Sequence, residues 1–111
     1  MPKALSGLAL ALFVMALVFG GVTAAESIPE DRRAHLMNLL VQDCGSCHGL
    51  TMKGGLGSPL LPENLEGKDD LALAELILDG IPETPMPPWR GQLSPAEAQW
   101  MVKQLKQGLR P

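Results

Sequence analysis

The chain has 111 residues, of which 46% are hydrophobic and only 4% aromatic, and its formal net charge is −3. A chain of this length forms one small domain, and such a domain buries little more than half of the surface that its unfolded form exposes. With so few aromatic side chains it needs a staple to fold stably, and without an excess of basic residues we expect no nucleic-acid partner.

The N-terminal stretch has the pattern of a secretory signal peptide. Lys3 is its only charged residue, residues 8–19 are all apolar, and small residues follow them. A basic start, an apolar middle and a small-residue exit predict cleavage after export. We therefore expect residues 1–25 to be a signal peptide and residues 26–111 to form the mature domain. The alternative is an uncleaved membrane anchor, because residues 4–25 are uncharged and long enough to span a bilayer.

Residues 29–44 are expected to form the first helix of the mature domain. Ser27, with Glu30 three positions later, has the spacing of a capping box at the helix start. Helically spaced apolar residues predict a buried stripe made of Leu36, Met37, Leu39, Leu40 and Val41. We expect His35 to be a partly exposed helix residue.

The helix leads into Cys44-Gly45-Ser46-Cys47-His48, the pattern for covalent attachment of a c-type haem. Thiols three residues apart lie on one side of a helical turn, where they can form thioethers with the two vinyl groups along one edge of the porphyrin. His48 is then held beneath the iron as its proximal ligand. We predict one haem c, bound through Cys44 and Cys47.

Three other uses of paired cysteines fit this chain less well. A thioredoxin-type dithiol belongs to alternating strands and helices, which the sequence does not indicate. A structural zinc site needs four ligands, and beyond these three only His35 remains as an imidazole or thiol donor. A disulfide between Cys44 and Cys47 would close too short a loop to add much stability, and it would leave His48 without a role.

Residues 49–62 contain four glycines and two prolines, which predict an irregular loop. Glycine lets a backbone approach closely, so this loop can wrap the proximal side of the haem. We expect the carbonyl oxygen of Pro59 to accept the Nδ1 hydrogen of His48 and to fix the orientation of the imidazole ring.

Residues 68–80 are expected to form a second helix. Asp69 or Asp70 can cap its start, and Gly80 can end it in a left-handed conformation. Its predicted inner stripe consists of Leu73, Leu76 and Ile77.

The next segment, residues 81–90, holds four prolines around Met86 and is called the strap below. So many prolines predict a stiff, extended backbone that is neither helix nor central strand. A rigid strap loses little entropy when its methionine binds iron, so we predict Met86 as the second axial ligand. Trp89 is expected to lie against the ring edge and to shield the iron–sulfur bond.

The other methionines of the mature chain are poorer candidates for the iron. Met37 and Met101 fall on apolar helix stripes and are expected to fill the core. Met52 follows His48 too closely to reach the opposite face of the ring. His35 is the only other imidazole that could take the place of a methionine.

Residues 94–108 are expected to form the last helix. Ser94, Pro95 and Glu97 supply a cap, a proline at the first helical position and a glutamate at the third. The apolar stripe, which should cross the first helix, consists of Ala98, Met101, Val102, Leu105 and Leu109. Trp100 lies off this stripe.

Together these features resemble the small monohaem class I cytochromes c, over residues 27–109. More narrowly, residues 42–57 and the strap sequence Thr84-Pro-Met-Pro-Pro-Trp89 are similar to cytochrome c-55X of the NirC type. The resemblance implies an all-α cytochrome c fold, with three to four short helices wrapped around one covalently attached haem. Gln104 departs from the pattern, since many class members have an aromatic residue in the last helix.

By position, the resemblance matches Cys44 and Cys47 to the thioether cysteines, His48 to the proximal ligand and Met86 to the distal ligand. Iron held on both sides has no free position for oxygen, peroxide or nitrite, so we expect an electron carrier and no enzyme activity. The resemblance implies a periplasmic protein that serves the dissimilatory, cytochrome-cd-type nitrite reductase and an upstream electron donor. Its alternatives are a role in maturation of the d-type haem, or a ligand-binding sensor or peroxidase if Met86 is not coordinated.

The charge pattern of the mature chain does not indicate a basic docking surface. The mature chain would carry a net charge of −4, because Lys3 leaves with the signal peptide, and its basic residues are scattered. We expect a monomer that docks weakly through an apolar patch around the ring edge, made of Gly54, Gly55, Leu56 and Pro87.

Overall fold

The computed structural model describes residues 27–109, so the predicted signal peptide lies outside the described residues. The described part is helical and contains no strand. Its elements are α1 (Glu30–Leu39), η2 (Leu40–Cys44), α2 (Gly45–His48), α3 (Pro62–Leu65), α4 (Asp70–Asp79) and α5 (Pro95–Gln107). None of these helices combines the length and the apolar character needed to cross a membrane. The prediction of an all-α domain is confirmed.

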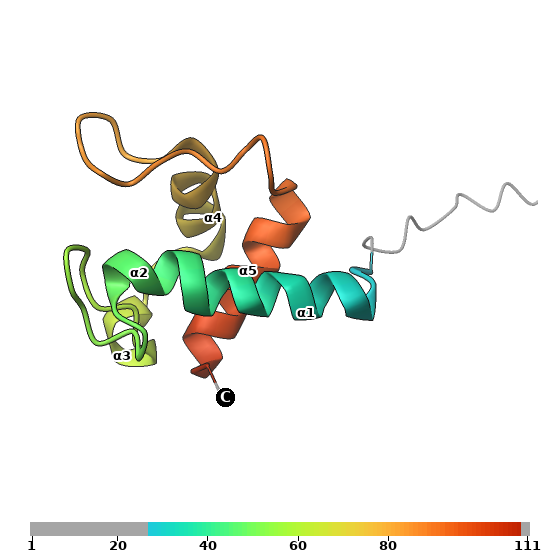
Figure 1. Cartoon of the computed structure of the whole chain (residues 1–111), viewed down its shortest axis with the longest axis horizontal. Helices are drawn as coiled ribbons and strands as arrows, with labels where there is room; N and C mark the ends of the chain where they lie inside the picture. The colour runs from blue at the N-terminus through green and yellow to red at the C-terminus, as the bar shows by residue number, and fades with distance from the viewer. Residues whose placement is uncertain (1–26, 110–111) are drawn as a thin grey trace, which may run out of the picture.

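The first three elements follow one another without a break and form the long rod that runs across Figure 1. Within η2 the helix widens to a π turn, in which the N–H of Gly45 donates to the carbonyl oxygen of Leu40, five residues earlier. The helix predicted to end at Cys44 is therefore present, and it continues through the haem-attachment pattern to His48.

The start of α1 differs from the prediction. The N-cap residue is Pro29, and no side chain caps the first turn. The carbonyl oxygen of Pro29 accepts the N–H of Arg33 at 2.9 Å. A capping side chain must belong to the N-cap residue itself, and Ser27 lies two residues before it. The predicted capping box is therefore wrong.

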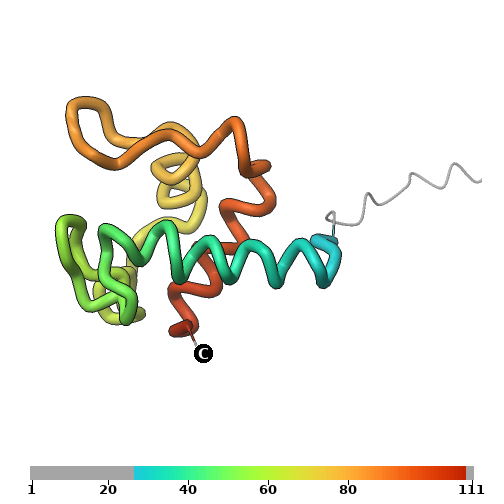
Figure 2. The backbone as a smooth tube through the Cα atoms, viewed as in Figure 1, coloured from blue at the N-terminus to red at the C-terminus, as the bar shows by residue number. Residues whose placement is uncertain are grey.

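The core lies where the rod and α4 pack against α5 (Figures 1 and 2). Its buried side chains are Leu36, Leu39 and Leu40 from the rod, Ala74 and Leu78 from α4, Ala98, Met101, Val102 and Leu105 from α5, and Met52, Leu65 and Leu93 from the segments between them. The crossing of the last helix with the first is thus confirmed, as are the first four residues of the predicted stripe, whereas the fifth, Leu109, lies beyond the end of α5 (Pro95–Gln107). Met37 and Leu109 are half-buried at the edge of this core, as is Trp100.

The helix α4 begins at the predicted cap, but its end and its buried face differ from the prediction. Gly80 has a positive φ, yet its ψ of −172° is not that of the left-handed conformation. The Asp69 carboxylate accepts the N–H of Ala72 at 2.8 Å, and Gly80 follows the helix with a φ of 68°. The buried residues are Ala74 and Leu78, whereas the predicted stripe of Leu73, Leu76 and Ile77 is half-buried to exposed.

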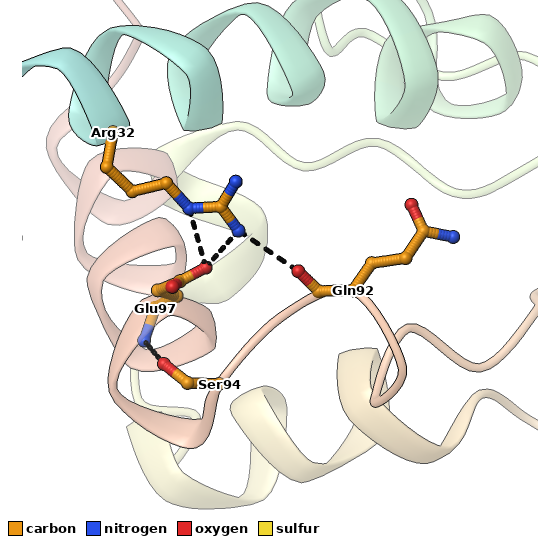
Figure 3. A network of polar contacts seen from close by, with 4 residues as sticks. All are labelled: Arg32, Gln92, Ser94 and Glu97. Atoms are coloured by element: carbon orange, nitrogen blue, oxygen red, sulfur yellow. Dashed lines mark hydrogen bonds and ion pairs between the residues drawn. The ribbon is translucent and has the colours of Figure 1, made fainter.

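A polar network fastens the start of α5 to α1 (Figure 3). The Ser94 hydroxyl accepts the N–H of Glu97 at 3.1 Å, which confirms the predicted cap. The Glu97 carboxylate accepts two hydrogen bonds from the Arg32 guanidinium, at 2.5 and 3.2 Å. The same guanidinium donates to the carbonyl oxygen of Gln92 at 3.0 Å, so one side chain joins α1 to both α5 and the turn before it.

Candidate haem site

A cavity of about 800 Å³ is lined by residues of the rod, residues 56–60, α3, α4, α5 and the strap. In Figure 1 the rod and the strap lie apart, with α4 beside the strap. All six side chains selected from the sequence line this cavity: Cys44, Cys47, His48, Pro59, Met86 and Trp89. The structure therefore brings together residues that lie up to 45 positions apart in the chain.

Most of the remaining wall is apolar. It is formed by Leu40, Leu56, Leu60, Leu65, Leu73, Leu76, Ile77, Ile81, Val102 and Leu105. The three α4 residues in this set are the stripe that was expected in the core. The helix thus has two apolar faces, one packed on α5 and one turned to the cavity, and helical spacing alone does not tell them apart.

His48 is held by the loop that follows it. Its Nδ1 lies 2.6 Å from the carbonyl oxygen of Ser58. A carbonyl oxygen only accepts, so the hydrogen is on Nδ1 and the Nε2 lone pair is free to bind a metal. The prediction that Pro59 supplies this carbonyl is wrong by one residue.

Two backbone hydrogen bonds set the register of that loop. Gly54 donates its N–H to the carbonyl oxygen of His48 and Gly57 donates to that of Cys47, both at 2.8 Å. A Cβ on Gly55 would lie only 2.8 Å from the carbonyl oxygen of Cys47, closer than real side chains allow. The loop thus packs closely on the backbone of Cys47 and His48, and this packing leaves the carbonyl of Ser58 facing the imidazole.

The two thiols sit at the junction of the π turn and α2. Cys44 is the last residue of η2 and Cys47 lies in α2, and both are partly buried. Burial, reinforced by the charge of Asp43, raises the pKa of the Cys44 thiol to about 11. A redox dithiol of the thioredoxin type needs a lowered pKa, so this environment disfavours that alternative.

The strap lines the cavity and contains no helix, as predicted, but its first half is not extended. The N–H of Thr84 donates to the carbonyl oxygen of Ile81 at 3.2 Å and Glu83 has a φ of 64°, so residues 81–86 form a turn.

Met86 lines the cavity and is half-buried. The N–H of Trp89 bonds to the carbonyl oxygens of Ile77 and Leu78 at 3.2 and 3.0 Å, which ties the end of the strap to α4. The Trp89 side chain forms part of the cavity wall.

Comparison with known proteins identifies the family. The family model described as cytochrome c oxidase, cbb3-type, subunit III matches residues 32–103. A cytochrome c55X of Pseudomonas aeruginosa is 53% identical over 85 residues, which cover 76% of this chain and 71% of that protein. A cytochrome c55X of Paracoccus denitrificans is 43% identical over 94 residues, covering 85% and 91% of the two chains. This chain belongs to the cytochrome c55X family.

Two solved structures agree with this assignment. The c-type cytochrome NirC superimposes with a TM-score of 0.70 at 51% identity, over 72% of this chain and 94% of that one. The dihydro-haem d1 dehydrogenase NirN, in complex with DHE, superimposes with a TM-score of 0.59 at 39% identity, over 67% of this chain and 16% of that one. This member of the c55X family therefore has a cytochrome c fold, as the resemblance implied.

Proteins of the cytochrome c family carry covalently bound haem c, and so does this chain. The residues around the cavity fit that group. Two thiols at adjacent helical turns can form thioethers with the porphyrin, and an imidazole with a free Nε2 and the thioether of the strap methionine are donors suited to iron. The rest of the wall is largely apolar, as an organic ring requires.

Proposed function

We propose that this chain is a one-electron carrier in which Cys44 and Cys47 bind one haem c through thioethers while His48 and Met86 ligate its iron. The observation that carries the proposal is that these four side chains line one cavity. When bound, haem supplies an iron centre that alternates between the ferric and ferrous states.

On the proximal side, the loop prepares His48 for ligation. The hydrogen bond from Nδ1 to the carbonyl of Ser58 selects the tautomer with a free Nε2. It also strengthens electron donation from the ring to a bound metal and holds the plane of the ring, as partners of metal-bound histidines generally do. Ser58 therefore tunes the strength of the proximal bond.

On the distal side, Met86 lines the cavity and would hold the position on the iron that a small molecule needs. If both axial positions of the iron are filled by side chains of this chain, oxygen, peroxide and nitrite would have no site on the iron, which disfavours bond-making catalysis. A methionine ligand and an apolar surrounding favour a high reduction potential. Trp89 and the leucines of α4 contribute apolar side chains to that surrounding.

We propose that the protein serves nitrite reduction in the periplasm. Its likeness to cytochrome c55X proteins and to NirC supports this context, and the pattern of residues 1–25 supports export. An intact mass of the purified chain tests the latter, because cleavage after Ala25 leaves 86 residues and a membrane anchor would leave all 111.

Transient docking to redox partners would use the apolar patch of Gly54, Gly55, Leu56 and Pro87. Leu56 is 77% exposed and also lines the cavity, so it lies at the cavity rim. Arg90 is already paired with two carboxylates of α4, which weakens it as a docking charge. Charge reversal at Lys53 or Arg90 should leave the rate of electron transfer nearly unchanged, whereas Leu56→Asp should slow it.

A second candidate, a role in maturation of the d-type haem, is favoured by one comparison. The dihydro-haem d1 dehydrogenase of Pseudomonas aeruginosa is 38% identical over 103 residues, which cover 93% of this chain and 19% of that enzyme. The ferric cytochrome can be mixed with that dehydrogenase and its substrate, and the ferrous cytochrome with nitrite reductase and nitrite. The faster of the two electron transfers identifies the role.

The test of the carrier proposal is spectroscopic. The purified chain should give the pyridine haemochrome of a doubly thioether-linked haem, and the reduced protein should not bind carbon monoxide rapidly. A colourless chain would contradict haem attachment. Rapid carbon monoxide binding would instead support the sensor or peroxidase alternative.

A further inference from the structure

Gly80 ends α4 at the point where the strap begins. Its φ of 68° and ψ of −172° lie in a region that is essentially restricted to glycine. Its N–H donates to the carbonyl oxygen of Leu76 at 2.9 Å, and the residue is buried. The backbone conformation accounts for a glycine at this position, and the space around it adds a second constraint.

A side chain at this position would collide with the strap. A Cβ on Gly80 would lie 2.7 Å from the carbonyl oxygen of Met86, and 2.8 Å from both the carbonyl carbon of Pro87 and the nitrogen of Pro88. All three are backbone atoms, so they cannot rotate away, and the two proline rings fix φ. Any side chain at position 80 must therefore displace the backbone that carries Met86.

The strap has little freedom to accommodate such a displacement. The N–H of Ile81 donates to the carbonyl oxygen of Met86 at 3.2 Å, and that of Trp89 to Leu78 at 3.0 Å. Between these ties, the Thr84 hydroxyl donates to the carbonyl oxygen of Ile81 at 2.7 Å and accepts the N–H of Met86 at 3.3 Å. Because hydrogen bonds hold the strap at both ends, a side chain at position 80 would displace mainly the backbone of Met86.

We propose that Gly80 is a positioning residue for Met86. The missing side chain lets the strap backbone rest directly on the end of α4, at the depth that places the Met86 thioether against the iron. Thr84 supports the same backbone from within the strap. This inference rests on the proposed function, since it requires Met86 to be the distal ligand.

The test uses the ferric holoprotein carrying Gly80→Ala, titrated with imidazole. Added imidazole competes with Met86, so its apparent affinity rises in proportion to the fraction of molecules in which the methionine is detached. We expect binding to tighten by about tenfold or more, together with a weaker sulfur-to-iron charge-transfer band. An unchanged band with an affinity within about twofold of wild type would overturn the proposal.

Gly67→Ala is the matched control. Gly67 also has a positive φ, of 76°, but no atom lies within 4 Å of the position that its Cβ would take. Alanine at position 67 must also adopt a positive φ, but its Cβ meets no other atom. The charge-transfer band and the imidazole affinity of Gly67→Ala should therefore equal those of wild type. If Gly67→Ala weakens the charge-transfer band and tightens imidazole binding as much as Gly80→Ala does, the effect is general destabilisation and the proposal is overturned.

Thr84→Val keeps the inference testable if Gly80→Ala does not accumulate as a folded protein. It removes one hydroxyl from an exposed residue, and we expect imidazole binding to tighten by about threefold. An unchanged affinity in Thr84→Val would then overturn the proposal. Met86→Ala distinguishes failure of the proposed function from failure of the positioning role of Gly80. A charge-transfer band that survives Met86→Ala would refute ligation of the iron by Met86 itself.

Discussion

Gly57 lies directly against the imidazole of His48: a Cβ on Gly57 would stand 2.8 Å from both Nδ1 and Cε1 of the ring. The next residue, Ser58, supplies the carbonyl oxygen that accepts from Nδ1. One face of the proximal ring and its outward nitrogen are thus both positioned by two consecutive residues of the glycine-rich loop.

Gly57→Ala should therefore alter the iron centre without unfolding the protein. The added methyl group forces the ring or the loop to move and weakens the Nδ1 hydrogen bond, which makes imidazole a poorer donor to ferric iron. We expect the reduction potential to rise by about 20–60 mV, the one-electron equivalent of a hydrogen bond of about 1 kcal/mol. Protein-film voltammetry measures this shift directly.

Gly91→Ala is the control for that substitution. Gly91 has no atom within 4 Å of its Cβ position, so the potential should stay at the wild-type value. Equal potentials for wild type, Gly57→Ala and Gly91→Ala would show that the loop does not position the imidazole.

Arg90 gives the stability of the protein a dependence on acid pH. Its guanidinium donates to the Asp79 carboxylate at 2.8 Å and holds the pKa of that carboxyl below its ordinary value. A lowered pKa contributes stability that is complete above the ordinary carboxylate value of about 4. This contribution is lost as the pH falls through the lower value of the folded protein.

The Tm of Arg90→Ala should therefore lie below that of wild type at pH 7, and the difference should shrink as the pH falls below about 4. Thermal melts across this range provide the measurement, with Lys103→Ala, another exposed cation, as the control. A difference that grows on acidification would contradict the assigned pair.

Leu36 tests the crossing of the rod with α5. It is fully buried in the core, so Leu36→Ala removes packed volume and should lower the free energy of unfolding by about 2–5 kcal/mol. Leu71 is 58% exposed, and Leu71→Ala should change it by less than about 0.5 kcal/mol. Denaturant titration of both holoproteins measures the two changes. Similar decreases in the free energy of unfolding would contradict the placement of Leu36 in the core.

We expect the chain to need its haem in order to fold. The cavity of about 800 Å³ is walled by leucines of several elements, and without an occupant these side chains lose their packing partner. The double variant Cys44→Ala, Cys47→Ala, purified without haem, should show low helicity by circular dichroism and no cooperative thermal transition. A sharp transition in this variant would mean that the chain folds unaided.

Local signals predicted the helix starts well where the capping residue is next to the helix. Asp69 and Ser94 cap α4 and α5 as expected. The predicted cap of α1 is wrong because Pro29 is the N-cap residue, which leaves Ser27 two residues before the helix. The π turn at η2 has no recognisable sequence pattern, since its residues also suit an ordinary α-helix.

The cavity shows what spacing alone does not determine. All six selected residues line it, because the haem-attachment pattern and the proline-rich strap are local and chemically specific. The identity of the carbonyl that meets His48 depends on the register of a flexible-looking loop, which the bond from Gly57 to Cys47 sets. The assignment of α4 faces depends on which apolar surface meets the cavity, and that is decided by the whole fold.

The most direct test of the account is the ferric visible spectrum of Met86→Ala beside that of Met37→Leu. Met86 lines the cavity whereas Met37 packs at the edge of the core, so only the first change should abolish the sulfur-to-iron charge-transfer band and let carbon monoxide bind the reduced protein. A band that survives in Met86→Ala would contradict ligation by this residue and, with it, the closed iron centre on which the electron-carrier function depends.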